Sequence, residues 1–229
     1  MMRGLFVTGT DTNVGKTVVC AALMHRYRQD FPMRYWKPVQ TGIEEQDDTA
    51  TVRHLGGCSD KEILDQGIRL KHPLSPHLAA ELEGETIELA RVCRVPLGQA
   101  KDFYWVVEGA GGVLVPLNKR DLMINLMKIL GLPVVVVART ELGTINHTLL
   151  TIEALNKREL PIAGVILVGE QKPDTRKTIA EHGRVLVLGE LPHLTDLTCE
   201  ALRTWALTSL DPTKHLAKYL ESQLVRRAC

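Results

Sequence analysis

The sequence predicts an α/β fold in which helices flank a doubly wound, mostly parallel sheet. Short apolar runs alternate along the chain with segments whose apolar residues recur at helical spacing, and this alternation is typical of such folds. Most of the runs are apolar at every position, which indicates strands that are covered by helices on both faces. A glycine-rich turn also joins the first run to the first helical segment.

These patterns place six strands and five helices in order along the chain. Strands are expected over residues 5–7, 34–36, 104–107, 133–137, 163–168 and 185–188. Helices are expected over residues 16–28, 122–130, 144–157, 196–207 and 213–224. The span 56–98 contains no clear strand pattern and is expected to supply surface loops and helices. Because no linker or repeat interrupts the chain, residues 1–229 are expected to form a single domain.

Composition and charge argue against several classes of protein. The formal net charge is +1, so the chain has no large field that would attract nucleic acid or an anionic membrane. The longest purely apolar run, residues 132–138, is far shorter than the roughly 20 residues that cross a bilayer. None of the five cysteines forms a C-x-x-C pair, which argues against zinc-ribbon and thioredoxin-like sites. We therefore expect a soluble cytoplasmic protein that binds neither nucleic acid nor membrane.

The strongest local signal is the segment 9–17, G-T-D-T-N-V-G-K-T, which follows the first strand and opens the first helix. Glycines let such a loop wrap around a phosphate, and backbone N–H groups at the helix start then bind the anion. Lys16 is expected to bind the β- and γ-phosphates, and Thr17 to offer its hydroxyl to Mg²⁺. Five residues separate Gly9 from Gly15, where the common motif has four. The segment predicts a P-loop NTPase, with nucleotide contacts from Thr12, Asn13, Val14, Gly15, Lys16, Thr17 and Val18.

Charged residues follow the second and third strands, at the edge of the sheet where the P-loop also lies. Lys37 would point toward the γ-phosphate, and the alternative is a solvated lysine at a strand end. Glu108 follows a buried strand, where a carboxylate is costly unless it meets a cation such as Mg²⁺. Asp47 and Asp48 fit either a further carboxylate of the site or the N-cap of a helix over residues 49–55.

A helix start follows the fourth strand and contains Gly143, Thr144 and Asn146. Free backbone N–H groups there would suit the carboxylate of a substrate, although an ordinary helix cap would use the same residue types. His77 and His147 do not have metal-ligand spacing, and we expect structural or capping roles for both.

Together these motifs resemble the dethiobiotin synthetase family over nearly the whole chain. The P-loop with five intervening residues is shared with related amidoligases and partition ATPases. Two motifs are more specific, namely K-P-V-Q-T-G at residues 37–42 and L-G-T-I-N-H at residues 142–147. The other markers are S-P-H at 75–77, V-E-G-A-G-G at 107–112 and G-E-L-P at 189–192.

The resemblance implies a reaction of biotin biosynthesis. The enzyme would use ATP and Mg²⁺ to carboxylate 7,8-diaminononanoate with CO₂, supplied as CO₂ or bicarbonate, and to close the ring of dethiobiotin, releasing ADP and phosphate. It would be a homodimer with the substrate site at the interface. The alternatives are an amidoligase of the cobyrinate amide synthase type, which usually carries a glutaminase domain, and a partition-type ATPase switch, which often has an additional lysine in the P-loop.

The resemblance also implies roles for individual residues. Lys16 and Lys37 would be catalytic, and Thr17, Asp48 and Glu108 would hold the metal ion. Substrate contacts would come from Thr41, Ser75, Gly143, Thr144 and Asn146. Further nucleotide contacts would come from Asp48, Glu108, Gly109, Ala110, Gly111, Gly169, Pro192, His193 and Leu194. Well-known members carry an Asn after the fifth strand that reads adenine. This chain has V-G-E-Q-K at residues 168–172 instead, so other nucleoside triphosphates are expected to serve besides ATP.

Overall fold

The computed structural model describes residues 2–99 and 101–225. Residues 1, 100 and 226–229, which include both ends of the expected single domain, lie outside the described part of the chain. The main sheet has seven strands in the order β4-β2-β6-β1-β7-β8-β9, and each pair of neighbouring strands is parallel. Strand order reverses at β1, which lies between β6 and β7. The predicted doubly wound α/β fold is therefore confirmed.

All six expected strands are present in the main sheet. Its members are β1 (Arg3–Gly9), β2 (Met33–Trp36), β4 (Ile63–Leu64), β6 (Tyr104–Gly112), β7 (Val134–Arg139), β8 (Ile162–Val168) and β9 (Val187–Leu191). The expected strand at 185–188 was placed too early. The preceding helix ends at Gly183 with Arg184 as its C-cap, and the N–H of Val185 still donates to Ala180 O, so this residue cannot yet pair with the sheet.

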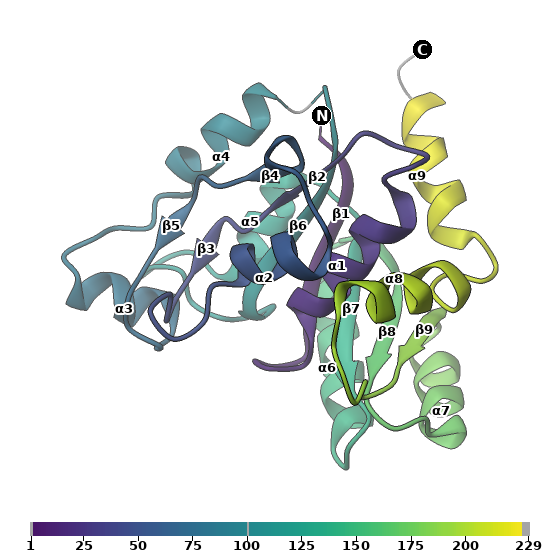
Figure 1. Cartoon of the computed structure of the whole chain (residues 1–229). Coiled ribbons are helices and arrows are strands. Elements are labelled where there is room, and N and C mark those ends of the chain that lie inside the picture. Colours follow the sequence, from purple (N-terminus) through teal and green to yellow (C-terminus); the bar gives the residue numbers. More distant parts are fainter. Residues whose placement is uncertain (1, 100, 226–229) are drawn as a thin grey trace.

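The span 56–98 was wrongly expected to contain no strand. It holds β4 and also β5 (Ile68–Arg69), which pairs with β3 (Val39–Gln40) in a separate two-stranded sheet. Strands of two residues are too short to show a period, so the sequence pattern could not reveal them. In Figure 1 this small sheet lies to the left of the main sheet, above α3 (Pro76–Leu82).

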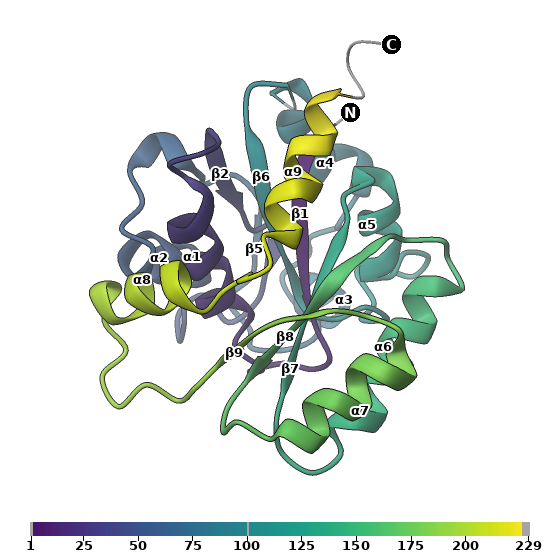
Figure 2. The same cartoon turned by 90° about the vertical axis from the view of Figure 1, so that its right-hand side faces the viewer.

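The helices divide between the two faces of the main sheet. The core on one face contains side chains of α1 (Lys16–Tyr27), α2 (Asp48–Leu55), α8 (Cys199–Thr208) and α9 (His215–Val225). The core on the other face contains side chains of α3, α4 (Leu89–Gly98), α5 (Met123–Leu130), α6 (Thr144–Asn156) and α7 (Pro173–Gly183). Figure 2 shows α1, α2 and α8 on one side of the sheet and α5, α6 and α7 on the other.

The alternation of side chains along the strands explains why the apolar runs are continuous. Leu5 and Val7 of β1 face α1, whereas Phe6 between them faces the opposite core. Helix α7 was not predicted, because only Ile179 on it is buried and its apolar period is therefore weak. Helix α8 begins three residues later than expected, where the Thr198 side chain accepts a hydrogen bond from Ala201 N. Among the described residues, no helix is both long and apolar enough to cross a lipid bilayer.

Candidate active site

The P-loop has the strand–loop–helix geometry that the sequence predicts. Gly15 has φ of 94° and precedes the first residue of α1, Lys16. A side chain at Gly15 would be strained by this backbone conformation, and its Cβ would lie 3.1 Å from Val168. A Cβ at Gly9 would lie 2.7 Å from Asp11 O. Both glycines are therefore needed for the path of the loop, which leaves β1 at the point where the strand order reverses.

Four polar side chains converge beside the P-loop. Lys37 Nζ lies 2.7 Å from Glu108 Oε1 and 2.7 Å from Asp48 Oδ2. Thr17 Oγ1 lies 2.9 Å from Glu108 Oε1 and 3.0 Å from Asp48 Oδ1. Lys37 also donates to Gly109 O at 3.2 Å, so all three of its N–H donors have a partner. The predicted convergence of Lys37, Asp48, Glu108 and Thr17 is thus present in the structure.

Strand register brings Lys37 and Glu108 together. Trp36 of β2 is paired with Val107 of β6, so the next residue on each chain is Lys37 and Glu108. Tyr35 and Val106 face the core beneath α1, and side chains two residues further along an extended chain return to the same face. Thr17 lies in the first turn of α1, and its hydroxyl donates a hydrogen bond to Glu108.

The two adjacent aspartates have different roles in the structure. Asp47 is the N-cap of α2, and its Oδ1 accepts hydrogen bonds from Thr49 N at 2.8 Å and Ala50 N at 3.1 Å. Asp48 is the first helical residue and directs its carboxylate to Lys37 and Thr17. The residue pattern left both aspartates open for either role, and the family resemblance implied Asp48 for the metal ion. The helix start gives Asp47 the capping role and leaves the Asp48 carboxylate in the cluster.

Burial and charge shift the pKa values of the groups in this cluster. Burial, with a further contribution from the charge of Lys37, lowers the pKa of Lys16 to about 8. Burial alone would lower the pKa of Lys37, but the carboxylates of Glu108 and Asp48 outweigh it and raise that pKa. Burial and then the charge of Glu108 raise the pKa values of Tyr35 and Cys20 well above their ordinary values. Tyr35 and Cys20 are therefore neutral neighbours of a cluster in which Lys37 is firmly cationic.

A cavity of about 350 Å³ opens over the cluster. Its lining includes most of the predicted phosphate, metal and catalytic residues, namely Thr12, Asn13, Gly15, Lys16, Thr17, Val18, Lys37, Thr41, Asp48, Glu108, Ala110 and Gly111. Val14 is instead buried in the core beneath α1. Gln40 and Gln46 also line the cavity and were missed. Gln40 stands inside the K-P-V-Q-T-G motif and could have been found there, whereas Gln46 carries no sequence signal.

The predicted carboxylate-binding segment lies outside this cavity. Gly143, with φ of 96°, is the N-cap of α6, and Asn146 is exposed. The Thr144 hydroxyl donates to Arg139 O at 2.6 Å and is therefore engaged within its own loop. Ser75 precedes α3 and is likewise not among the described residues that line the cavity.

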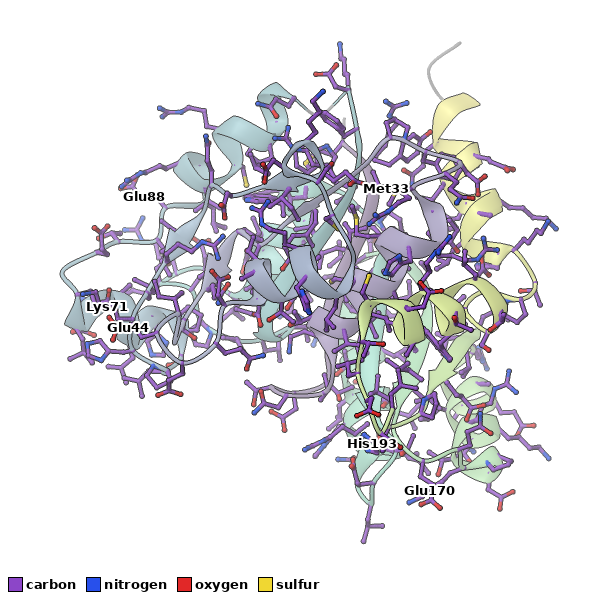
Figure 3. All side chains as sticks on the ribbon, in the orientation of Figure 1. Met33, Glu44, Lys71, Glu88, Glu170 and His193 are labelled. Carbon is purple, nitrogen blue, oxygen red and sulfur yellow. The ribbon has the colours of Figure 1, made fainter. Side chains whose placement is uncertain are left out.

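The loops after β8 and β9 reach the same edge of the sheet as the P-loop. Gly169 has φ of 133°, and a Cβ there would lie 2.4 Å from Thr140 Oγ1 and 3.5 Å from His193 Nε2. Figure 3 shows Glu170 and His193 at the same end of the molecule. Of the predicted base contacts, Gly169 has no side chain, Pro192 and Leu194 offer only apolar ones, and His193 offers an imidazole. These residues are not among those described as lining the cavity.

The donor set of the cluster fits Mg²⁺. Two carboxylates and a hydroxyl, from Asp48, Glu108 and Thr17, meet within hydrogen-bond distance, and Mg²⁺ prefers such oxygen ligands together with substrate phosphates. Within residues 2–99 and 101–225, no group of three or more His, Cys, Asp or Glu side chains could hold a metal ion. A site with few protein ligands that is completed by phosphate oxygens matches magnesium better than zinc.

Comparison with known proteins identifies the family. A family model described as an AAA domain matches residues 3–201. An ATP-dependent dethiobiotin synthetase from Agrobacterium fabrum is 46% identical over 86% of this chain and 89% of its own length. A protein of the same name from Brucella ovis is 48% identical over 88% of this chain and 92% of its own length. The chain belongs to the dethiobiotin synthetase family.

Solved structures of other proteins have a fold similar to that of this chain. A ParA family ATPase from Chlorobium tepidum covers 90% of the chain with a TM-score of 0.57 and 12% identity. Cobyrinic acid a,c-diamide synthase from Mycobacterium smegmatis, with bound ADP and magnesium, covers 90% with a TM-score of 0.54 and 16% identity. At such low identity these likenesses show the fold alone. The sequence relatives favour a dethiobiotin synthetase over the amidoligase and partition-ATPase alternatives.

Proposed function

We propose that this protein uses ATP to carboxylate 7,8-diaminononanoate with CO₂ and to close the ureido ring of dethiobiotin. The observation that carries the proposal is the position of Lys37, whose ammonium is held by Glu108 and Asp48 in the wall of the P-loop cavity. Family membership supports the choice of substrate, since the relatives are named for this product.

The reaction brings two anions together. One amine of the substrate adds to CO₂ and loses a proton, which gives a carbamate. A carbamate oxygen attacks the γ-phosphorus of ATP, and ADP leaves with the electrons of the broken P–O bond. The second amine then attacks the carbamate carbon, loses a proton and displaces phosphate, which closes the ring. The second of these steps needs positive charge between the carbamate and the phosphoryl group.

The residues of the cavity can supply that charge and the required alignment. Lys16 and the backbone N–H groups of the P-loop bind the phosphates. Lys37 and Thr41 both line the same cavity, where they can contact the carbamate. Thr17, Asp48 and Glu108 would hold Mg²⁺, which when bound neutralises charge on the β- and γ-phosphates. Holding both reactants in one cavity also removes the entropic cost of their encounter.

The proposal includes a homodimer. Leu142 is fully exposed and directly precedes the helix start at Gly143. Leu114 and Leu150 are about half exposed and line one surface cavity beside α6. Exposed leucines of this kind favour burial against a second copy of the chain. A second copy there would add its Gly143–Asn146 segment to the substrate site, as the family resemblance implies.

We propose the cytoplasm as the compartment, where the free thiols of Cys20, Cys58, Cys93 and Cys199 stay reduced.

The direct test follows both products. The protein is incubated with the diamine, bicarbonate, Mg²⁺ and ATP, while phosphate release is measured and dethiobiotin is detected by mass. We expect phosphate and dethiobiotin to form in equal amounts, and phosphate release to depend on the diamine. Phosphate release that is the same with and without the diamine would contradict the proposal.

A further inference from the structure

The two oxygens of the Glu108 carboxylate have different surroundings. Oε1 lies 2.7 Å from Lys37 Nζ and 2.9 Å from Thr17 Oγ1, on the side of the cavity. Oε2 accepts a hydrogen bond from Tyr35 OH at 2.9 Å, on the side of the protein interior. Both side chains are fully buried. Water therefore cannot replace the Tyr35 hydroxyl without a rearrangement of the core.

We propose that Tyr35 is a positioning residue, whose hydroxyl fixes the rotation of the Glu108 carboxylate so that Oε1 faces Thr17, Lys37 and a bound Mg²⁺. Tyr35 cannot itself be catalytic, because its fully buried hydroxyl reaches neither the cavity nor a substrate. The inference rests on the proposed function only in that it requires a Mg²⁺–triphosphate complex at the P-loop.

The fold accounts for the position of Tyr35. It lies on β2 two residues before Lys37, so both side chains point to the face that α1 covers. Tyr35 is paired with Val106 of β6, two residues before Glu108. Two neighbouring parallel strands therefore present the hydroxyl, the carboxylate and the ammonium in one row, with Glu108 between the other two.

Partners behind a metal-binding carboxylate orient it and keep one oxygen available. Without the Tyr35 hydroxyl, Oε2 would be a buried acceptor with a lost partner, and the carboxylate would turn to share its oxygens with Lys37 and Thr17. The expected result is weaker binding of Mg²⁺ with an intact P-loop. Loss of such a partner commonly weakens metal binding by about 10- to 100-fold.

The test is Tyr35→Phe, which removes only the hydroxyl. Binding of a non-hydrolysable ATP analogue is measured by calorimetry at increasing Mg²⁺, without the diamine, so failure of the ring closure leaves this readout unaffected. We expect the half-saturating Mg²⁺ concentration to rise at least about tenfold, and affinity for the analogue in EDTA to stay unchanged. A half-saturating concentration within twofold of the unmodified protein overturns the proposal.

Two other buried tyrosines serve as matched controls. Tyr104, on the neighbouring strand β6, has a buried hydroxyl without a hydrogen-bond partner in the described part of the chain, so Tyr104→Phe should change nothing. Tyr27 donates to Asp211 at 2.7 Å, away from the site, so Tyr27→Phe should lower stability without altering Mg²⁺ dependence. If Tyr27→Phe shifts the Mg²⁺ dependence as much as Tyr35→Phe does, the effect comes from stability and the proposal fails.

A second measurement covers the case in which Tyr35→Phe is too unstable to purify. Glu108→Gln removes the charge that the hydroxyl stabilises, so adding Tyr35→Phe to Glu108→Gln should cost less stability than Tyr35→Phe costs alone. If Tyr35 acts through Glu108, the double variant and Glu108→Gln should bind Mg²⁺ equally weakly. A further loss of Mg²⁺ affinity in the double variant would show that Tyr35 acts on something else.

Discussion

Lys37 and Glu108 form an ion pair in which the side chains are only 3% and 0% exposed, with Nζ 2.7 Å from Oε1. Asp48 Oδ2 lies at the same distance from the ammonium. Charges removed from water are retained only when they are well paired, and here the ammonium is held by two carboxylates and a backbone carbonyl. The arrangement keeps a rigid cation at the edge of a phosphate-binding cavity.

Replacing Lys37 should separate binding from chemistry. In Lys37→Ala we expect turnover to fall by about 10²- to 10³-fold, because charge developing between carbamate and phosphate loses its partner. Affinity for ATP should stay within about threefold, since the P-loop is unchanged. Steady-state kinetics and calorimetry measure the two quantities. Lys71→Ala is the control, since Lys71 is exposed and pairs only loosely with Glu44 at 3.7 Å. Figure 3 shows these two residues together at one edge of the molecule. Near-normal turnover in Lys37→Ala would contradict the assigned role.

The adjacent aspartates should respond in different ways. Asp47→Ala removes the cap of α2 and should cost about 1 kcal/mol of unfolding free energy, with Mg²⁺ dependence unchanged. Asp47→Asn should restore most of that stability, because Asn is also a good N-cap. Asp48→Asn should raise the Mg²⁺ requirement for turnover, and should also lower stability because the buried Lys37 ammonium loses one of its two carboxylates. Urea unfolding measures the stability of each variant, and Mg²⁺ titrations of turnover measure its metal requirement. A raised Mg²⁺ requirement in Asp47→Ala would contradict the assignment of Asp47 to the cap and Asp48 to the metal.

The His25 side chain should make stability depend on pH. Burial, with the charges of Arg28 and Arg203, lowers its pKa from the usual 6.5, although hydrogen bonding to Leu55 O and the charge of Glu200 act in the opposite direction. The unfolded chain therefore binds more protons at this position. The stability that His25 contributes is fully present above pH 6.5 and is lost as the pH falls through the folded-state value.

The corresponding measurement is the free energy of unfolding in urea at pH 7 and pH 5. His25→Gln keeps a donor for Leu55 O but does not titrate, so we expect a smaller decrease between the two pH values than in the unmodified protein. His54→Gln, at an exposed position of α2, should reproduce the unmodified decrease. If the free energy of unfolding of His25→Gln decreases between pH 7 and pH 5 as much as that of the unmodified protein, other groups are responsible for the loss of stability in acid.

The nucleotide base should be weakly discriminated. Gly169 has no side chain, and the close approach of Thr140 to this position leaves no space for one. His193 Nε2 lies 3.5 Å from the position of a Cβ at Gly169, but the Asn of the well-known family members is absent. A site with fewer side-chain hydrogen bonds to the base rejects the wrong base less strongly. We expect kcat/KM for CTP and GTP to lie within about tenfold of that for ATP. Glu170→Ala should leave these ratios unchanged, and an ATP preference above about 10³-fold would contradict the prediction.

The proposed dimer should depend on the exposed leucines near α6. Burying one leucine against a partner contributes about 1.5–3 kcal/mol, so a charge in its place should weaken association strongly. We expect the Leu142→Glu and Leu150→Glu variants to have the mass of a monomer when it is measured by light scattering, and to have reduced turnover. Leu207→Glu, at an exposed position on α8, should behave like the unmodified protein. If the unmodified protein is itself a monomer at working concentration, the dimer proposal is wrong.

Much of the site could be predicted because the sequence carries local signals for it. Lys37 and Glu108 each follow an apolar run, and the carboxyl ends of parallel strands necessarily gather at one edge. Thr17 and Lys16 were found from the glycine pattern. These predictions needed only the order of the elements and no knowledge of how the side chains pack.

The residues that were missed depend on contacts between distant segments. Arg69 donates to Gln40 Oε1 and to Thr49 Oγ1, and so ties the small sheet to α2, but its two-residue strand has no period. The contact of Tyr35 with Glu108 requires the register of β2 against β6, which no local pattern contains. Asp47 and Asp48 could not be separated because the exact start of a helix is set within one residue by its cap.

The chain leaves the main sheet after Trp36 and enters the small sheet at Val39, so Lys37 and Pro38 form the junction between them. The cavity wall consequently has two parts, one carrying Lys16, Thr17 and Glu108 and the other carrying Gln40 and Thr41. Replacements on the small sheet can reshape one half while the phosphate-binding half keeps its framework. Directed evolution toward other diamines should therefore begin with β3, β5 and the turn that contains Thr41.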